Sequence, residues 1–258
     1  MARTVKLERD GDVGILSLDS PPLNLFDDRM INDLTALLEE AEGEMLRALV
    51  VRAEGKVFTG GVDVHVFDDK TPEQAAALFR DLVRIVHKLE GMPVPTIASV
   101  QGLCLTAGLE LALGCDLLLA ADDARFGLVE RVVGLTPAMG GTQRMAERAG
   151  PARAREFVMT GELYDAPTLE RWNVVNRVYP AADLREETAK FAQRLATGPT
   201  KAHAATKAMV RAFLDHGVRG ADDRIGDIAA PLFATQDLQN AVDTFLAEGP
   251  GKATFEGR

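Results

Sequence analysis

The sequence predicts an α/β protein whose last quarter is helical. Short apolar strand patterns alternate with amphipathic helical patterns up to about residue 180, an order typical of α/β folds. Beyond that point only helical patterns remain, separated by glycine and proline breaks. We therefore expect an α/β core over residues 1–181 and a C-terminal helical region over residues 182–258.

The N-terminal elements follow from strand and turn signals. An apolar strand at 5–9 runs into Asp10-Gly11, a hairpin signal, and 13–18 is the returning strand. Residues 27–41 carry apolar side chains at helical spacing, which predicts a helix. Residues 48–52 are a short buried strand.

The rest of the core continues the alternation. Thr71-Pro72 begins a helix, with Thr71 as its cap and proline at the first helical position. We expect strands at 96–100 and 116–121, an apolar helix at 109–113, and a turn at 126–128. The helix after Thr71 should face the core with Leu78, Leu82, Ile85, Val86 and Leu89.

Composition limits the class of protein. The formal net charge of −10 over 258 residues argues against nucleic-acid or anionic-membrane partners, which select a basic face. No window approaches the length of a membrane helix, and the N-terminus lacks an export pattern, so we expect a cytoplasmic protein. Cys104 and Cys115 form no disulfide or metal pattern, and the four histidines lack ligand spacing, so no metal is predicted.

Two carboxylates stand beside stretches that expose backbone N–H groups. Glu110 follows the small residues Thr106-Ala107-Gly108, and Glu130 follows the turn predicted at 126–128. A second small-residue loop lies upstream at 58–63. Two carboxylates can divide acid and base work on one water, and free N–H groups can hold an oxyanion. The arrangement indicates proton chemistry beside a thioester or ketone carbonyl.

Six segments in the same order resemble the enoyl-CoA hydratase/isomerase (crotonase) family, and they cover nearly the whole chain. They are SPPLNLFDDRM (20–30), VFTGGVDV (57–64), QGLCLTAGLELALGCDLLLAADDARFGLVE (101–130), GLTPAMGGTQR (134–144), TGELYDAPTLERWNVVNRV (160–178) and GPTKAHAATK (198–207). The resemblance implies a spiral of ββα units and a C-terminal helical region that forms trimers, often paired into hexamers.

The resemblance also implies the site. Its two oxyanion-hole donors map onto the N–H groups of Val62 and Ala107. Many members have glycines where this chain has Thr106 and Ala107, so a positive φ at Ala107 would be strained. Glu110 would deprotonate water, and Glu130 would exchange the proton at C2 of a 2-enoyl-CoA. No prosthetic group is expected, because the substrate is itself a coenzyme A thioester.

Coenzyme A contacts are also implied by the resemblance. The first loop and the residues after it would follow the cofactor, where His65 replaces a frequent lysine and is mostly neutral at pH 7. A C-terminal aromatic reaches a neighbouring subunit's CoA in some members. The expected contacts are Thr59, Gly60, Asp63, Val64, His65 and Phe245.

Several activities remain open on the sequence. Hydration of a 2-trans-enoyl-CoA is the leading hypothesis, because both glutamates are present. A double-bond isomerase, a dehydratase or a carbon–carbon lyase on another acyl-CoA is the alternative within the superfamily. A non-catalytic CoA-thioester or RNA binder is disfavoured by the acidic balance and by the absence of a lysine-rich helix. A glycosidase could use two carboxylates, but its sugar platforms need aromatics and this chain has one Trp.

Overall fold

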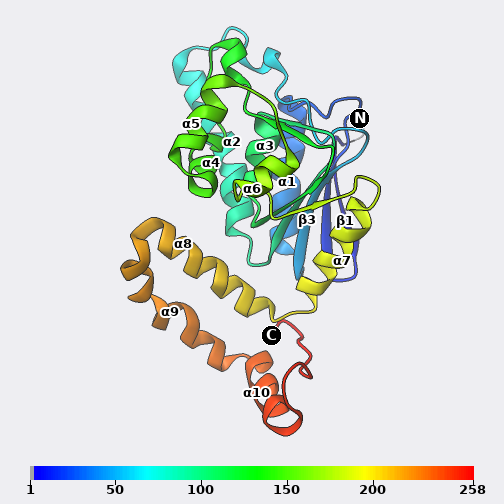
Figure 1. Ribbon diagram of the computed structural model, residues 1–258, viewed down its shortest axis with the longest axis vertical. Helices are drawn as coiled ribbons and strands as arrows, with labels where there is room; N and C mark the ends of the chain where they lie inside the picture. The colour runs from blue at the N-terminus through cyan, green and yellow to red at the C-terminus, as the bar shows by residue number, and fades with distance from the viewer. Residues whose placement is uncertain (1–2) are drawn as a thin grey trace.

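The computed structural model describes residues 3–258, which contain a six-stranded sheet and a three-stranded sheet (Figure 1). In spatial order the larger sheet consists of β1 (Val5–Asp10), β2 (Val13–Leu18), β3 (Ala48–Ala53), β4 (Thr96–Val100), β6 (Leu117–Ala121) and β9 (Arg177–Tyr179). The smaller sheet consists of β5 (Leu103–Leu105), β7 (Arg125–Gly127) and β8 (Tyr164–Asp165). The β1–β2 and β7–β8 pairs are antiparallel, and the remaining pairs are parallel.

The helices follow the β1–β2 hairpin along the chain. The α-helices are α1 (Asp28–Gly43), α2 (Pro72–Gly91), α3 (Ala107–Leu113), α4 (Gly141–Ala149), α5 (Pro151–Thr160), α6 (Ala166–Arg171), α7 (Leu184–Ala196), α8 (Thr200–Asp222), α9 (Ile225–Ala229) and α10 (Gln236–Glu248). Three 3₁₀ helices are η1 (Val64–Phe67), η2 (Glu130–Val133) and η3 (Ala230–Ala234).

The local signals in the sequence account for most of these boundaries. The predicted hairpin is confirmed, with Asp10 paired to Val13 across the turn. Thr71 caps α2 through a capping box with Gln74, as its position before proline predicts. The turn predicted at 126–128 is wrong, because Arg125–Gly127 form strand β7. That strand has three residues and exists through pairing with β5 and β8, which no local pattern signals.

The chain winds through a repeated strand–strand–helix unit, which confirms the spiral of ββα units. In the second pair of units, β4 is followed by β5 and α3, and β6 is followed by β7, η2 and α4. In the first pair, the second strand is reduced to single bridges, where Phe26 pairs with Val62 and Thr59 pairs with Cys104. All of these second strands are parallel, so their carboxyl ends meet at one edge of the stack.

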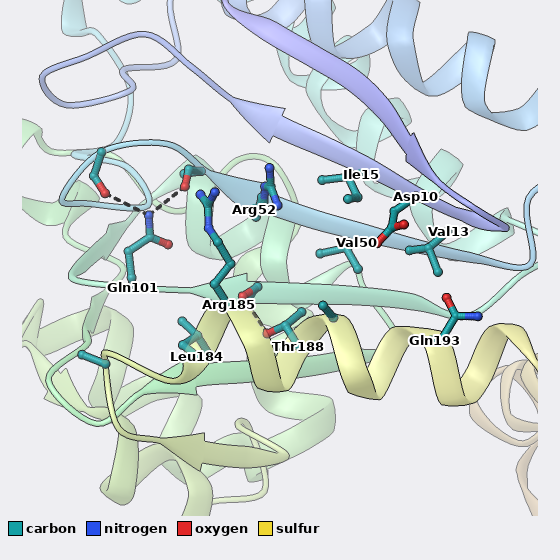
Figure 2. Close-up of a pocket in the computed structure, with 15 residues that line it drawn as sticks. Asp10, Val13, Ile15, Val50, Arg52, Gln101, Leu184, Arg185, Thr188 and Gln193 are labelled. Carbon is teal, nitrogen blue, oxygen red and sulfur yellow. Dashed lines mark hydrogen bonds between the residues drawn. The ribbon is translucent and has the colours of Figure 1, made fainter.

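The two faces of the larger sheet are covered differently. Helices α1 and α3 pack on one face, and α7 lies over β2, β3, β4 and β6 on the other. A cavity of about 170 Å³ remains under α7 (Figure 2). Three of its polar side chains are paired within the protein, since Ser99 and Thr188 share a hydrogen bond and Gln101 donates to Ala53 and Gly55. None of the predicted site residues lines this cavity.

The helices after residue 182 do not behave as one unit. Helix α7 belongs to the covering of the sheet, whereas α8, α9 and α10 leave the core and form a projecting arm (Figure 1). The C-terminal tail returns to the base of this arm, where Arg47 donates hydrogen bonds to Gly198 and Phe255. Within residues 3–258 no helix combines the length and the apolar character that crossing a membrane requires.

Candidate active site

The predicted site residues meet where the stacked second strands end. Val62 follows the Thr59 bridge, Ala107 follows β5, and Glu130 follows β7. Because these segments are parallel neighbours, residues up to 68 positions apart reach one edge of the stack. The topology therefore brings together the two glutamates and the two N–H groups that the sequence singled out.

Glu110 is a buried carboxylate held by backbone donors. It lies in the first turn of α3, and its Oε1 accepts hydrogen bonds from the N–H groups of Met139 (2.8 Å) and Gly141 (2.7 Å). Burial raises the pKa of Glu110 to about 7, although the N–H groups of Gly141 and Met139 act in the opposite direction. Close to neutral pH this side chain can therefore either accept or release a proton.

Glu130 is buried with no hydrogen bond to its carboxylate. It begins η2, and within residues 3–258 neither Oε1 nor Oε2 has a partner. Burial raises the pKa of Glu130 to about 8, and the nearby charge of Glu110 adds to the effect. Surface pairing with Arg131 is thus not its role, because Arg131 donates instead to the backbone oxygen of Thr160. An unpaired buried carboxyl costs folding free energy, which is typical of a functional position.

The two glutamates influence one another and titrate as a pair. The charge on Glu110 is among the causes that raise the pKa of Glu130, so the first proton lost near neutral pH makes the second harder to lose. Between about pH 7 and pH 8, one carboxylate and one carboxylic acid face the same site. One acid and one base are the pair that addition or removal of water requires.

The two expected oxyanion donors differ in their surroundings. The Ala107 N–H makes no hydrogen bond to any group in residues 3–258. The Val62 N–H donates to the hydroxyl of Thr106, at 3.1 Å. The positive φ that would be strained at Ala107 occurs instead at Thr106, which has φ 47° and ψ −125°, whereas Ala107 is the first residue of α3. A β-branched residue in that region costs on the order of 1–3 kcal/mol.

The first loop supplies shape as well as surface. Thr59 is fully buried, with its N–H bonded to Leu103 and its hydroxyl bonded to the Asn24 carbonyl. The Gly60 N–H donates to the Leu23 carbonyl. Asn24 is also buried, and its side-chain amide donates to the backbone oxygens of Glu54 and Val57. These contacts hold the turn around Asn24 against the first loop.

The residues after this loop form an exposed segment. Asp63 caps η1, and one of its carboxylate oxygens lies 2.6 Å from His65 Nδ1. This hydrogen bond raises the pKa of His65, so the imidazolium persists to higher pH than in an isolated histidine. The expectation of a mostly neutral His65 ignored this partner. Val64 is exposed beside it, and Phe245 is exposed on α10, which lies in the projecting arm (Figure 1).

An open groove of about 510 Å³ is lined on one side by Val133, the last residue of η2, the short helix that begins at Glu130. Its walls are η1 and the start of α2 on one side, and the residues just after Glu130 on the other. The apolar part of the lining consists of Val64, Phe67, Ala75, Phe79, Val133 and Leu135. Sequence reasoning did not identify this groove, because its two walls are about 60 residues apart in the chain.

Arg144 supports the candidate site, although no prediction was made for it from the sequence. It is buried and makes a two-pronged ion pair with Glu90, with both N–O distances at 2.8 Å. Its Nη1 also donates to the carbonyl of Gly140, inside the 139–141 turn that binds Glu110. A two-pronged arginine–carboxylate pair fixes geometry as well as charge. The GGTQR segment could have indicated this role, because it places Arg144 four residues after Gly140 in the 139–141 turn.

Comparisons with known proteins agree with this fold. The sequence model of the family described as enoyl-CoA hydratase/isomerase matches residues 8–258. A protein named probable enoyl-CoA hydratase from Mycobacterium bovis is 35% identical over 248 residues, with 94% of this chain and 95% of the relative covered. A crotonyl-CoA hydratase from Syntrophomonas wolfei is 28% identical, with 96% of each chain covered.

A solved structure has the same fold over nearly the whole chain. An enoyl-CoA hydratase subunit from Geobacillus kaustophilus superimposes with a TM-score of 0.93 at 32% identity, covering 99% of this chain and 98% of that one. The fold and the paired carboxylates define an α/β enzyme of the crotonase class. The chain belongs to the enoyl-CoA hydratase/isomerase family.

Proposed function

We propose that the protein is an enoyl-CoA hydratase, which adds water in the syn sense to a 2-trans-enoyl-CoA and gives a 3-hydroxyacyl-CoA. The observation that supports this most directly is the pair of buried glutamates with different surroundings. Glu110 is anchored through one oxygen by two N–H groups, whereas both oxygens of Glu130 are unpaired within residues 3–258. The relatives named enoyl-CoA hydratase and crotonyl-CoA hydratase support the same reaction.

Glu110 is the base in this proposal. Its Oε1 is occupied by Met139 and Gly141, which leaves Oε2 to hold a water molecule. With a pKa of about 7, the carboxylate is half ionised at neutral pH and can take a proton from that water. As the proton leaves, the water oxygen bonds to C3 and the C2=C3 electron pair moves toward the thioester oxygen.

Glu130 is the acid. With a pKa of about 8 it is mainly protonated at pH 7, and no hydrogen bond within residues 3–258 holds its carboxyl. It delivers its proton to C2 when the enolate collapses back to the thioester. Glu110 then carries the proton that Glu130 has lost, and exchange with solvent restores the starting state. The two pKa values thus favour the same division of roles that the family resemblance implies.

The thioester oxygen needs donors while it carries negative charge. The N–H groups of Ala107 and Val62 are the donors we propose, on neighbouring parallel segments at the edge of the strand stack. Removal of one such donor typically lowers kcat by roughly 10²–10³-fold. The groove lined by Val133 and Leu135 would take the acyl chain, and Gly60, Asp63, Val64 and His65 would follow the coenzyme A part, with imidazolium at His65 facing a phosphate. The side chain of Thr59, also expected to contact coenzyme A, is fully buried and bonded to the Asn24 carbonyl, so it is not part of this contact. No prosthetic group is needed for this chemistry.

Assembly through the arm is part of the proposal. Large apolar side chains are exposed along α8, α9, η3 and α10, and surfaces of this kind normally meet a partner. We propose a homotrimer or a dimer of trimers, in which Phe245 reaches a neighbouring subunit's coenzyme A. The exposed apolar residues are Val210, Phe213, Leu214, Val218, Ile225, Phe233, Val242, Phe245 and Leu246.

A double-bond isomerase is the second candidate. It needs one proton shuttle, and Glu130 alone could supply that shuttle. The burial and raised pKa of Glu110 favour hydration, because a second titrating carboxyl is then placed in the same site. Glu110 is therefore the residue whose replacement separates the two activities.

The deciding experiment follows the ultraviolet absorbance of the conjugated thioester with a panel of enoyl-CoA chain lengths. Glu130→Gln should abolish both hydration and C2 proton exchange, and Glu110→Gln should reduce hydration more than exchange. Each loss should be roughly 10²–10⁴-fold, the range for one positioned acid or base. Hydration in Glu110→Gln within a few-fold of the parent would contradict the proposal, as would isomerisation without hydration in the parent.

A further inference from the structure

Thr106 links every element of the candidate site. Its N–H donates to the carbonyl of Gly127, the last residue of β7 and three positions before Glu130. Its carbonyl accepts the N–H of Glu110 at 3.0 Å. Its hydroxyl accepts the N–H of Val62 at 3.1 Å. One residue thus contacts the strand before one glutamate, the second glutamate itself, and an expected oxyanion donor.

The backbone of Thr106 occupies a region that a β-branched residue avoids. Its φ of 47° with ψ of −125° is a conformation normally left to glycine. The hydrogen bonds of its N–H and carbonyl hold it there on both sides. Such strain persists where the surroundings over-determine the conformation, and it concentrates at functional sites. Here the strain places a hydroxyl group where glycine would leave open space.

The neighbouring glycine is shaped to receive this hydroxyl. A Cβ added to Gly61 would lie 2.5 Å from Thr106 Oγ1, so only glycine fits at position 61 while the hydroxyl is in place. Thr106 is largely buried, and its hydroxyl accepts from Val62 but donates to no group in residues 3–258. Its proton is therefore available, and the hydroxyl is polarised by the N–H donated to it.

We propose that the Thr106 hydroxyl is itself an oxyanion-hole donor, inserted between the Val62 N–H and the thioester oxygen. This proposal rests on the proposed acyl-CoA function of the same site. The developing enolate oxygen would accept hydrogen bonds from the Ala107 N–H and from the Thr106 O–H, which belong to adjacent residues. The Val62 N–H then acts through the hydroxyl, by orienting its oxygen and increasing its acidity. The hole becomes one backbone donor plus one side-chain donor.

A competing arrangement uses the same contact in the opposite sense. If the thioester oxygen needs the Val62 N–H directly, the hydroxyl must be displaced each time substrate binds. Removal of the hydroxyl would then increase kcat/KM. The two arrangements predict opposite signs for one substitution, so a single kinetic comparison separates them.

The experiment compares Thr106→Val, Thr106→Ala and Thr106→Ser in the full-length protein. Valine keeps the shape of threonine without its hydroxyl, and alanine is the second variant in case valine impairs folding. Both should lower kcat by roughly 10²–10³-fold, the usual loss for one donor, with the Kd for a saturated acyl-CoA changed less than about threefold. Thr106→Ser keeps the hydroxyl and should recover at least about tenfold of that loss.

Thr35→Val is the matched control. The Thr35 hydroxyl donates to the Ile31 carbonyl within α1, a helix that carries none of the candidate site residues. Thr35→Val removes a threonine hydroxyl, as Thr106→Val does, and should leave kcat unchanged. A Thr106→Ala variant that turns over at the parental rate, or faster, would overturn the proposal.

A spectroscopic readout separates this inference from the reaction itself. The infrared stretching frequency of a ¹³C-labelled thioester carbonyl falls when donors bind its oxygen. With a bound saturated acyl-CoA, the parent and Thr106→Ser should show a lower frequency than Thr106→Val and Thr106→Ala. Equal frequencies in all four would refute the role of Thr106 even in an active hydratase. A shifted frequency in a parent that hydrates no enoyl-CoA would instead refute only the proposed reaction.

Discussion

Gly141→Ala tests the geometry of Glu110 without touching a titratable group. A Cβ at position 141 would lie 2.7 Å from Glu110 Cγ and 3.1 Å from its Oε1. The Glu110 side chain must therefore move by about 0.7 Å to reach the 3.4 Å at which ordinary contact begins. Such a shift pulls Oε1 away from the N–H groups of Met139 and Gly141, which now lie at 2.8 and 2.7 Å.

The magnitude follows from what that movement disturbs. A displacement of about 1 Å in a catalytic group costs roughly 10²-fold in rate, so we expect kcat for hydration to fall by about that factor. Loss of N–H donors to the carboxylate also favours its protonated form, so the pKa of Glu110 should rise above its value of about 7. The acidic limb of the pH–rate profile should therefore move to higher pH.

Steady-state hydration measured across pH checks both effects. Gly43→Ala, at the end of α1, is the matched control, because a Cβ at that glycine meets nothing within 4 Å and its effect on kcat should be negligible. Circular dichroism establishes that both variants are folded. A folded Gly141→Ala protein with near-parental kcat and an unmoved acidic limb would show that Glu110 does not depend on the 139–141 turn.

Three further predictions follow from the same structure. Activity of the parent should be bell-shaped in pH, falling below about 7 as Glu110 protonates and above about 8 as Glu130 ionises, and Glu110→Gln should lose the acidic limb; a flat profile across this window would argue against the assignment. The raised pKa of Glu130 means that the folded state binds its proton more tightly than the unfolded state. The stability that this proton contributes is fully present below about pH 4.5 and is lost as pH rises toward about 8. Urea unfolding at pH 9 should therefore find Glu130→Gln more stable than the parent by a few kcal/mol, on the order of the shift in pKa, and no more stable at pH 4. Phe213→Glu with Val218→Glu on α8 should reduce a trimer or hexamer to smaller species in light scattering, and a parent that is monomeric at micromolar concentration would contradict the assembly.

Local sequence information predicted the elements that local interactions create. The β1–β2 hairpin and the cap of α2 depend on residues within a few positions of one another, such as Asp10-Gly11 and Thr71 with Gln74. Strand β7 was missed because three residues carry no periodicity, and its partners lie about 20 and 40 residues away. Short segments of this kind are specified by their neighbours in space, not by their own composition.

The site shows the same division. The position of both glutamates could be inferred from the order of motifs, and the structure brings them together. The ion pair between Arg144 and Glu90 spans 54 residues, so no spacing rule connects the two. The hydroxyl of Thr106 on the Val62 N–H is likewise a contact across 44 residues. The sequence indicated only that Thr106 stands where glycine is usual, and the fold shows that its hydroxyl contacts the Val62 N–H.

The stacked second strands have a consequence for how substrate preference can change. Glu110, Glu130 and the two N–H donors are fixed by the strand stack, whereas one wall of the groove belongs to η1 and to the loop before α2. That loop, residues 68–71, joins η1 to α2. The residues proposed for the reaction and the groove proposed for the acyl chain therefore belong in part to different segments of the chain. Exchanging residues 68–70 for a longer or shorter segment, with the coenzyme A segment at 63–65 and the α2 cap Thr71 kept, would change which thioesters are accepted, while the proposed acid, base and oxyanion donors stay in place.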